Sequence, residues 1–459
     1  MKRPIVFLHG YSARANAFDA WRNALESAGW PAEQLHAISY ESLSNEVSIR
    51  DIAEAFDRLL GEQLGLDADA PFDLIVHSTG MLVARAWLTR RGNRGARRAR
   101  LRHLIALAPS TFGSPLAHKG RSLLGALVNG RRSPGPDFLE AGDQVLDALE
   151  LGSRFLWDLA HEDLFGHETF YDHDAGTPYV FAFCGTRASR MARAIVPTAG
   201  TDGVVRWAGC PLNARRIMLD LTADCPDGER VRVHASANED IPVHLVPGLD
   251  HGAILRTPSP ALVERVVAAL AVEDAPAYRH WHEQTRQTWP DAPSSASWQQ
   301  FIVRAIDERG DPVTDWNLQF LLDDGRVPIP FAQDVHVYRG DRSLRTFHVR
   351  LDTLQTAADL APQPLVARLY ASTGTRRVRY SGALTTMVSD GDDARAPDAG
   401  VFTGSLNLTT VLPGGVRVFH PWTTTFIELR LERDPLIGND AVADVAVPIR
   451  RPNAPFIAG

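Results

Sequence analysis

The residues best placed to carry out chemistry are Ser78 and its neighbours. A short apolar run ends at His77-Ser78, and an apolar run with helical spacing begins directly after Thr79-Gly80. A serine on a sharp turn between a strand and a helix holds its hydroxyl above the sheet edge, close to the N–H groups of the helix N-terminus. Serine is also a common helix cap, but the flanking pattern favours the other role. The sequence therefore predicts that Ser78 is a nucleophile.

A serine hydroxyl needs an imidazole to accept its proton, and that imidazole needs a carboxylate to hold its tautomer. Two turns that contain glycine supply these groups. Asp202 lies in the first turn, between Thr201 and Gly203, and His251 lies in the second, between Asp250 and Gly252. Each turn follows an apolar, strand-like run. We therefore expect a triad of Ser78, His251 and Asp202.

Other residues compete for two of these roles. Asp202 has four rivals among the aspartates: Asp224, Asp227, Asp240 and Asp250. Asp250 adjoins His251, and consecutive side chains in a loop tend to diverge, so it is a poor orienting residue. His234 and His244 lie in strand-like runs, where packing roles are expected, and His9 and His77 are expected to orient the loops of the site.

Five segments in this order resemble the α/β-hydrolase superfamily, in its bacterial lipase and esterase branch. They are Phe7-Leu8-His9-Gly10-Tyr11, His77-Ser78-Thr79-Gly80, Leu107-Ala108-Pro109-Ser110-Thr111-Phe112-Gly113-Ser114-Pro115-Leu116-Ala117, Thr201-Asp202-Gly203 and Asp250-His251-Gly252. The resemblance implies the chain order nucleophile, acid, histidine, which Ser78, Asp202 and His251 follow. It also implies an oxyanion hole formed by the backbone N–H groups of Tyr11 and Thr79. One departure is Val76, where the family usually has glycine, so we expect the turn at Ser78 to be slightly opened.

The elements expected around these residues alternate between strands and helices up to about residue 275. Strand-like runs cover residues 5–8, 36–40, 72–76, 101–108, 179–184, 216–221, 230–235 and 243–246, and helical spacing covers residues 18–28, 49–64, 81–89 and 259–271. This alternation predicts a mostly parallel sheet covered by helices on both faces. Residues 1–275 are therefore expected to form an α/β-hydrolase catalytic domain.

The alternation is interrupted between residues 113 and 174. Apolar residues with helical spacing occur there without a strand-like run among them. Long insertions in such folds often cover the active site, at the carboxyl ends of the strands. We expect residues 113–174 to form a helical cap or lid with an apolar underside; a helical excursion packed on the sheet edge is the plainer alternative.

A change of composition separates the rest of the chain. Residues 276–298 are interpreted as a linker because small, polar and proline residues gather at 291–297. Beyond them, short alternating runs are separated by turn residues, which predicts that residues 299–459 form an all-β, antiparallel sandwich without a catalytic constellation. At the level of the fold alone, it resembles the C2-like and PLAT-like modules that help some lipases to engage interfaces.

Composition restricts the class of protein. A net charge of -7 and a pI near 6.1 argue against binding to nucleic acid. Three cysteines do not suggest a disulfide framework. The N-terminal apolar stretch is too short for a signal peptide, and no segment approaches the roughly 20 apolar residues of a membrane span. We expect a cytoplasmic protein, or one that is exported without a cleavable signal peptide.

The expected activity is hydrolysis of hydrophobic carboxylic esters through an acyl-enzyme, with no metal and no organic cofactor. The apolar insertion favours a lipid or another hydrophobic ester as substrate, and contact with a membrane surface is compatible with such a substrate. The alternatives are a phospholipase or an acyltransferase acting on membrane lipids, and a binding protein for lipid or a partner that kept the scaffold without catalysis. The oligomeric state is not predicted.

Overall fold

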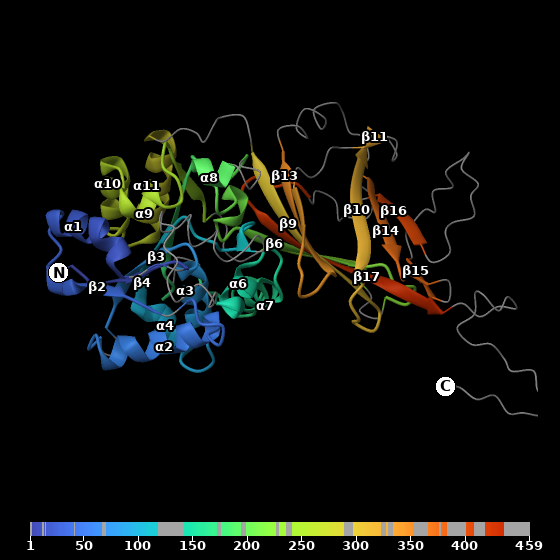
Figure 1. The fold of residues 1–459 in the computed structure, drawn as a ribbon, viewed down its shortest axis with the longest axis horizontal. Coiled ribbons are helices and arrows are strands. Elements are labelled where there is room, and N and C mark those ends of the chain that lie inside the picture. Colours follow the sequence, from blue (N-terminus) through green and yellow to red (C-terminus); the bar gives the residue numbers. More distant parts are fainter. Residues whose placement is uncertain are drawn as a thin grey trace, which may run out of the picture.

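The computed structural model describes residues 2–117, 142–171, 176–288 and 297–435. Short gaps within these ranges are residues 12, 14, 41, 67–69, 194–198, 226–228, 236–240, 323–326, 329–333, 352–365, 376–377, 383–400 and 408–417. Two units lie side by side along the long axis of the molecule (Figure 1). The first contains a parallel sheet with helices, and the second contains two further sheets.

A six-stranded parallel sheet forms the centre of the first unit. Its order is β2-β1-β3-β4-β5-β8, and every pairing along it is parallel. The strands are β1 (Ile5–Leu8), β2 (Leu35–Ile38), β3 (Phe72–His77), β4 (Leu101–Leu107), β5 (Tyr179–Gly185) and β8 (Val243–Val246). Most of their residues are buried, as expected for strands with helices on both faces. The predicted α/β-hydrolase sheet is confirmed.

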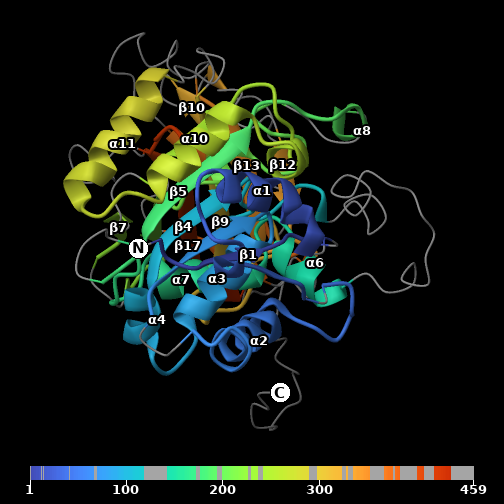
Figure 2. The same ribbon diagram turned by 90° about the vertical axis from the view of Figure 1, so that its left-hand side faces the viewer.

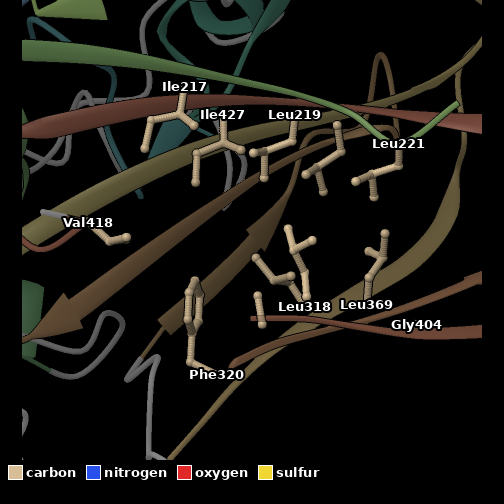
Figure 3. A pocket seen from close by; sticks show the side chains of 12 residues that line it. Ile217, Leu219, Leu221, Leu318, Phe320, Leu369, Gly404, Val418 and Ile427 are labelled. Atoms are coloured by element: carbon tan, nitrogen blue, oxygen red, sulfur yellow. The ribbon is translucent and has the colours of Figure 1, made fainter. Parts of the chain in front are cut away.

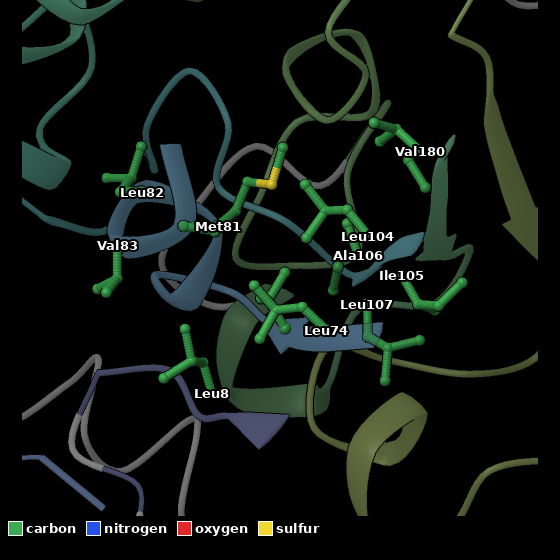
Figure 4. Close-up of a cluster of buried hydrophobic side chains, with 14 of the residues drawn as sticks. Leu8, Leu74, Met81, Leu82, Val83, Leu104, Ile105, Ala106, Leu107 and Val180 are labelled. Atoms are coloured by element: carbon green, nitrogen blue, oxygen red, sulfur yellow. The ribbon is translucent and has the colours of Figure 1, made fainter. Parts of the chain in front are cut away.

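Helices cover both faces of this sheet (Figure 2). One face carries α1 (Asp19–Ser27), α9 (Ala253–Arg256), α10 (Pro260–Ala269) and α11 (Ala275–Thr288), and the other carries α2 (Ile49–Glu62), α3 (Gly80–Thr89) and α4 (Arg94–Arg100). Every residue of α3 is buried, because the helix is enclosed by β3 of the sheet, α2 and α7 (Arg154–Asp163). Figure 4 shows the apolar cluster in which Met81 and Leu82 of α3 lie near side chains of β1, β3, β4 and β5.

The expected linker, residues 276–298, is in part a helix. Helix α11 occupies its first half, and residues 289–296 lie outside the described residues. Tyr278 donates a hydrogen bond from its hydroxyl to the Val180 carbonyl at 2.7 Å, and the Trp281 ring lies 4.7 Å from the ring of Phe181. The helix therefore packs on β5 of the first unit. Composition near residues 291–297 does not reveal this apolar face.

Two helices of the predicted insertion, α6 (Asp143–Leu149) and α7 (Arg154–Asp163), are present where apolar spacing predicts them. Helix α7 is held from two sides. Asp163 forms a buried ion pair with Arg85 of α3 at 2.7 Å, and the Trp157 ring lies 5.5 Å from Phe426 of the second unit. These helices thus fill the space between the two units. Of the residues expected in the cap, 118–141 and 172–174 lie outside the described residues, and closure over the site stays a prediction.

The second unit contains a mixed seven-stranded sheet and an antiparallel four-stranded sheet. The mixed sheet has the order β12 (Asp334–Val337), β13 (Leu344–Arg350), β9 (Trp298–Asp307), β17 (Thr424–Pro435), β6 (Ala214–Asp220) and β7 (Val231–Ala235), with β15 (Val378–Ser381) paired to β17. The antiparallel sheet has the order β11 (Val327–Pro328), β10 (Asp315–Leu322), β14 (Val366–Ser372) and β16 (Val401–Asn407). The short alternating runs predicted beyond residue 299 form strands where they lie within the described residues.

Two expectations about these strands are wrong. Strands β6 and β7 were expected in the parallel sheet of the first unit, but they complete the mixed sheet of the second unit. In addition, β17 runs parallel to both β9 and β6, so the sandwich is not wholly antiparallel. The spacing of apolar residues along β6 fits a strand of either the parallel sheet or the mixed sheet. The sequence pattern therefore identifies the strand but does not identify its sheet.

The two sheets pack face to face through apolar side chains (Figure 3). Ile217, Leu219 and Ile427 come from the mixed sheet, and Leu318 and Phe320 from the antiparallel sheet. A small cavity of about 30 Å³ remains between them, with an almost wholly apolar lining. Such a space is large enough for a water molecule but offers nothing polar to hold it. This region is a packed core.

Candidate active site

Ser78 lies on a sharp turn between β3 and α3. Its φ angle is +53°, a left-handed conformation that is costly for a residue with a side chain. The turn is held by backbone hydrogen bonds: the Ser78 N–H donates to the Leu107 carbonyl of the neighbouring β4 at 3.1 Å, and the Ser78 carbonyl accepts from the Met81 N–H at 3.1 Å. The turn closes in this way with valine at position 76. Strain of this kind is expected where a nucleophile must stand above the end of a sheet.

Two glycines allow the chain to approach Ser78 closely. A Cβ atom on Gly80 would lie 2.6 Å from the Leu8 carbonyl oxygen, and one on Gly10 would lie 2.8 Å from Cβ of Ser78. The loop that follows β1 therefore runs directly beside the serine. Tyr11 directly follows Gly10 in this loop, and Thr79 is the residue before the first turn of α3, whose N–H groups have no partner within the helix.

Asp202 and His251 come together although 49 positions separate them. The Nδ1 atom of His251 lies 2.8 Å from Oδ2 of Asp202, and both side chains are almost fully buried. The second carboxylate oxygen, Oδ1, accepts hydrogen bonds from the N–H groups of Val204 at 2.9 Å and Val205 at 2.8 Å. The carboxylate is thereby fixed by its own loop and points one oxygen at the imidazole.

The other imidazole nitrogen of His251 is available. With Nδ1 donating to the carboxylate, Nε2 carries the lone pair, and it is buried without a hydrogen-bond partner in the described part of the chain. Ser78 does not form this bond in the present conformation. Hydrogen bonds of catalytic groups are often long in the absence of substrate. A buried nitrogen without a partner is costly, and such cost is expected where a proton must be accepted.

His77, the residue before Ser78, also contacts His251. Its Nε2 donates to the backbone carbonyl of His251 at 2.9 Å, and the two rings lie 4.8 Å apart. Burial lowers the pKa of His77 well below its ordinary value, and the neighbouring His251 lowers it further. His77 is therefore neutral at pH 7. This contact agrees with the expected orienting role of His77.

The rival residues have other contacts. Asp250 accepts hydrogen bonds at Oδ1 from the N–H groups of Gly252 and Ala253 at the start of α9. His244 is buried on β8 and lies 2.8 Å from a ring nitrogen of His282. His234 belongs to β7 in the second unit and Asp224 is exposed, whereas Asp227 and Asp240 lie outside the described residues.

One residue at the site has no signal in the sequence. The thiol of Cys184, at the end of β5, lies 3.6 Å from Oδ2 of Asp202 and donates to it. Burial raises the pKa of Cys184 well above its ordinary value, and the neighbouring Cys210 and Asp202 raise it further, so the thiol keeps its proton. A single cysteine in an apolar strand is indistinguishable from a packing residue until the fold places it beside a carboxylate. Among the described residues, no group of three metal-binding side chains gathers in one place.

The fold is that of the α/β-hydrolases, and the carboxyl ends of its parallel strands carry a serine on a strained turn and a buried Asp–His pair. Similarity to solved structures agrees with this fold. The chain is similar to phospholipase PlaB from Legionella pneumophila, with a TM-score of 0.75 and 22% identity over 96% of each chain. The same protein in complex with thio-NAD gives a TM-score of 0.73 and 23% identity, over 95% of this chain and 96% of that chain.

A lower similarity links the chain to the lipase BlEst2 from Bacillus licheniformis. Its mature form gives a TM-score of 0.37 and 16% identity, over 58% of this chain and 92% of that chain. No protein-family model and no curated protein sequence matches this chain. At these identities, the likeness to PlaB establishes a shared fold that extends over both units.

Proposed function

We propose that this protein is a serine ester hydrolase that cleaves acyl esters of lipids. The observation that carries the proposal is the 2.8 Å hydrogen bond between His251 and Asp202, two residues that the chain order predicts as partners. The strained turn at Ser78 and the unpartnered Nε2 of His251 support it. These features match the needs of nucleophilic catalysis by serine.

The proposed reaction has two half-reactions. Ser78 Oγ attacks the ester carbonyl carbon while His251 Nε2 takes its proton. His251 then gives that proton to the alkoxide leaving group, and the alcohol departs. Water repeats the cycle on the acyl-enzyme and releases the acid. Asp202 holds the tautomer of His251 and stabilises the imidazolium that forms in each half-reaction.

Negative charge that develops on the carbonyl oxygen needs donors fixed beforehand. The backbone N–H groups of Tyr11 and Thr79 are proposed for this role, because the loop after β1 and the start of α3 flank Ser78. Donors of this kind typically contribute about 3–4 kcal/mol each to the stabilisation of the transition state.

The proposed substrate is a phospholipid. The support is the similarity of fold, over both units, to a protein described as a phospholipase. No helix within the described residues is both long and apolar enough to span a bilayer.

The test compares wild type with Ser78→Ala on p-nitrophenyl esters from acetate to palmitate and on phosphatidylcholine and phosphatidylglycerol vesicles. Loss of the nucleophile is expected to lower turnover by about 10⁴- to 10⁶-fold. Asp202→Asn should lower it by about 10⁴-fold, because the wrong tautomer of His251 is then favoured. Wild type should also be labelled by a fluorophosphonate, and Ser78→Ala should not.

Two outcomes contradict the proposal. Turnover that survives in folded Ser78→Ala excludes this serine as the nucleophile. Wild type that neither turns over an ester nor reacts with the fluorophosphonate indicates a binding protein. Release of fatty acid from p-nitrophenyl esters but not from phospholipid vesicles retains the hydrolase and removes the phospholipid.

A further inference from the structure

The loop that carries Asp202 is short and closed. Thr201 and Arg206 face each other in an isolated β-bridge, and the Trp207 N–H donates to the Gly200 carbonyl at 2.9 Å. The chain therefore leaves the loop almost where it enters. A displacement of its base moves Asp202 as well, because the carboxylate is bonded to the backbone of the same loop.

The base of this loop lies on the second unit. Gly200, with a φ of +72°, packs against Trp298 of β9 so closely that a Cβ atom would lie 2.6 Å from the indole. On the exit side, Oγ1 of Thr424, the first residue of β17, donates to the Ala208 carbonyl at 3.1 Å. The mixed sheet thus contacts both ends of the Asp202 loop.

Arg206 provides the charged contact. Four residues after Asp202, its side chain is 1% exposed and its Nη2 lies 2.5 Å from Oδ2 of Asp334 on β12. Its Nη1 lies 3.4 Å from the side-chain oxygen of Gln300 on β9. Burial lowers the pKa of Arg206, and attraction to Asp334 opposes this shift. A buried guanidinium is tolerated only while such partners remain.

We propose that Arg206 and Asp334 are positioning residues for the candidate triad: the ion pair holds the Asp202 loop on the mixed sheet, so the second unit sets the Asp202–His251 hydrogen bond. This inference rests on the proposed function. It assigns to the second unit a role in the chemistry that differs from engagement of a lipid interface. The pair acts through Asp202 and does not touch the reacting atoms.

The principal variant is Asp334→Asn, which keeps the shape of the partner and removes its charge. Arg206 then remains buried without a counter-charge, and the base of the loop relaxes. We expect kcat to fall about 5- to 20-fold while KM changes less than about 2-fold, because a positioning contact acts on the transition state. The imidazolium loses stabilisation, so the acidic limb of the pH–rate profile moves to lower pH. Asp334→Glu, which keeps the charge, should recover most of the rate.

A matched control lies on the same strand. His336 of β12 is bonded through Nε2 to Oε1 of Glu150 at 2.9 Å, and Glu150 is 3% exposed. This pair also joins β12 to the first unit, but Glu150 directly follows α6 and does not belong to the Asp202 loop. Glu150→Gln should lower thermal stability without moving kcat or the acidic limb.

A second readout does not require turnover. The proton on Nδ1 of His251, in a buried hydrogen bond to a carboxylate, is expected to give a separate low-field ¹H NMR resonance. Asp334→Asn should move it upfield, whereas Glu150→Gln should leave it in place. If that shift occurs in a protein that hydrolyses no ester, the inference stands and the proposed function fails.

The inference is overturned if Asp334→Asn lowers only thermal stability, with the resonance, kcat and the acidic limb as in wild type; ester hydrolysis by the wild type would then still support the proposed function. It is also overturned if Glu150→Gln and Asp334→Asn change kcat and the resonance equally. That result would mean that any loss of contact at β12 loosens the whole interface.

Discussion

Two buried Asp–His pairs lie at opposite ends of the same parallel sheet. At the carboxyl ends of the strands, His251 Nδ1 lies 2.8 Å from Asp202; near the amino ends, His103 Nδ1 lies 2.7 Å from Asp73. The four side chains are all nearly fully buried. By distance and burial alone the two pairs are alike.

The second ring nitrogen separates them. Nε2 of His103 lies 2.7 Å from the Val272 carbonyl, and Arg3 adds an ion pair to Asp73 at 3.3 Å. Nε2 of His251 is buried and has no partner among the described residues, and the strained Ser78 lies on the adjoining turn. The pair at the amino end is satisfied and the pair at the carboxyl end is not. An Asp–His pair therefore indicates catalysis only where the rest of the fold leaves the outer nitrogen open.

The sharpest test of this comparison exchanges the two histidines for glutamine separately. His251→Gln should lower kcat/KM by about 10⁴- to 10⁶-fold, because the proton acceptor is lost. Its free energy of unfolding should change little, since one costly unpartnered nitrogen also disappears. His103→Gln should lower stability by about 1–3 kcal/mol through broken buried hydrogen bonds and keep kcat/KM within about 3-fold of wild type. Ester hydrolysis and urea unfolding measure both quantities.

The comparison breaks if the two variants behave alike. Folded His103→Gln that has lost turnover would place the amino-end pair in the chemistry. Folded His251→Gln that keeps its turnover would remove His251 from the triad.

His244 is a buried histidine whose hydrogen-bond partner is His282 rather than a carboxylate, which allows a comparison with the two Asp–His pairs. Burial, together with the charges of Arg286 and Arg265, lowers the pKa of His244 to about 3. The unfolded chain binds the proton near pH 6.5, so the contribution to stability is full above pH 6.5 and is lost as the pH falls toward 3. Between pH 7 and pH 5, the loss is about 2 kcal/mol, at 1.36 kcal/mol for each pH unit below 6.5. Urea unfolding at several pH values measures it.

The matched variants for this test are His244→Asn and His280→Asn. The first keeps a polar group beside His282 and should flatten the fall of stability between pH 7 and pH 5. His280 is exposed on α11, so its replacement should leave that slope unchanged. Equal slopes in wild type and His244→Asn would show that other groups take up the proton.

The smallest expected effect concerns Cys184, the thiol that donates to Asp202 and has no counterpart in the contacts found for Asp73. Removal of this donor leaves more of the carboxylate charge for the imidazolium. Cys184→Ala should therefore move the acidic limb of the pH–rate profile upward by a few tenths of a unit, consistent with the weakness of a thiol donor. Cys184→Ser keeps a donor and should move it less. A downward shift in Cys184→Ala would show that the thiol positions the carboxylate instead.

Sequence patterns predicted the parts of this protein that depend on local order. The strand–turn–helix around Ser78 and most strands of both units follow from apolar spacing and turn residues, whereas β11 and β16 were not predicted. The predicted pairing of Asp202 with His251 follows from chain order within the resemblance, and the two residues do lie in contact. Their catalytic roles, the function of the cap and the compartment remain predictions.

The remaining features depend on contacts between distant segments. Nothing in the spacing of β6 indicates that it pairs with β17, more than 200 residues away. Arg206 and Asp334 are ordinary charged residues until two sheets enclose them. Cys184 contacts Asp202 only because β5 ends beside the Asp202 loop. The spacing of apolar residues predicts which side chains are buried, but it does not predict which other segment covers them.

The position of β17 has a consequence for synthesis on the ribosome. The strand pairs with both β6 and β9, and its Thr424 contacts the end of the Asp202 loop. These pairings of the mixed sheet therefore cannot be completed until residue 435 has been synthesised. Pairing across so long a separation is slow, because the loop entropy must be lost first. A nascent chain can thus form the parallel sheet and the turn at Ser78 long before Asp202 is held in place. The candidate site would be completed late, after most of the chain up to residue 435 has left the exit tunnel.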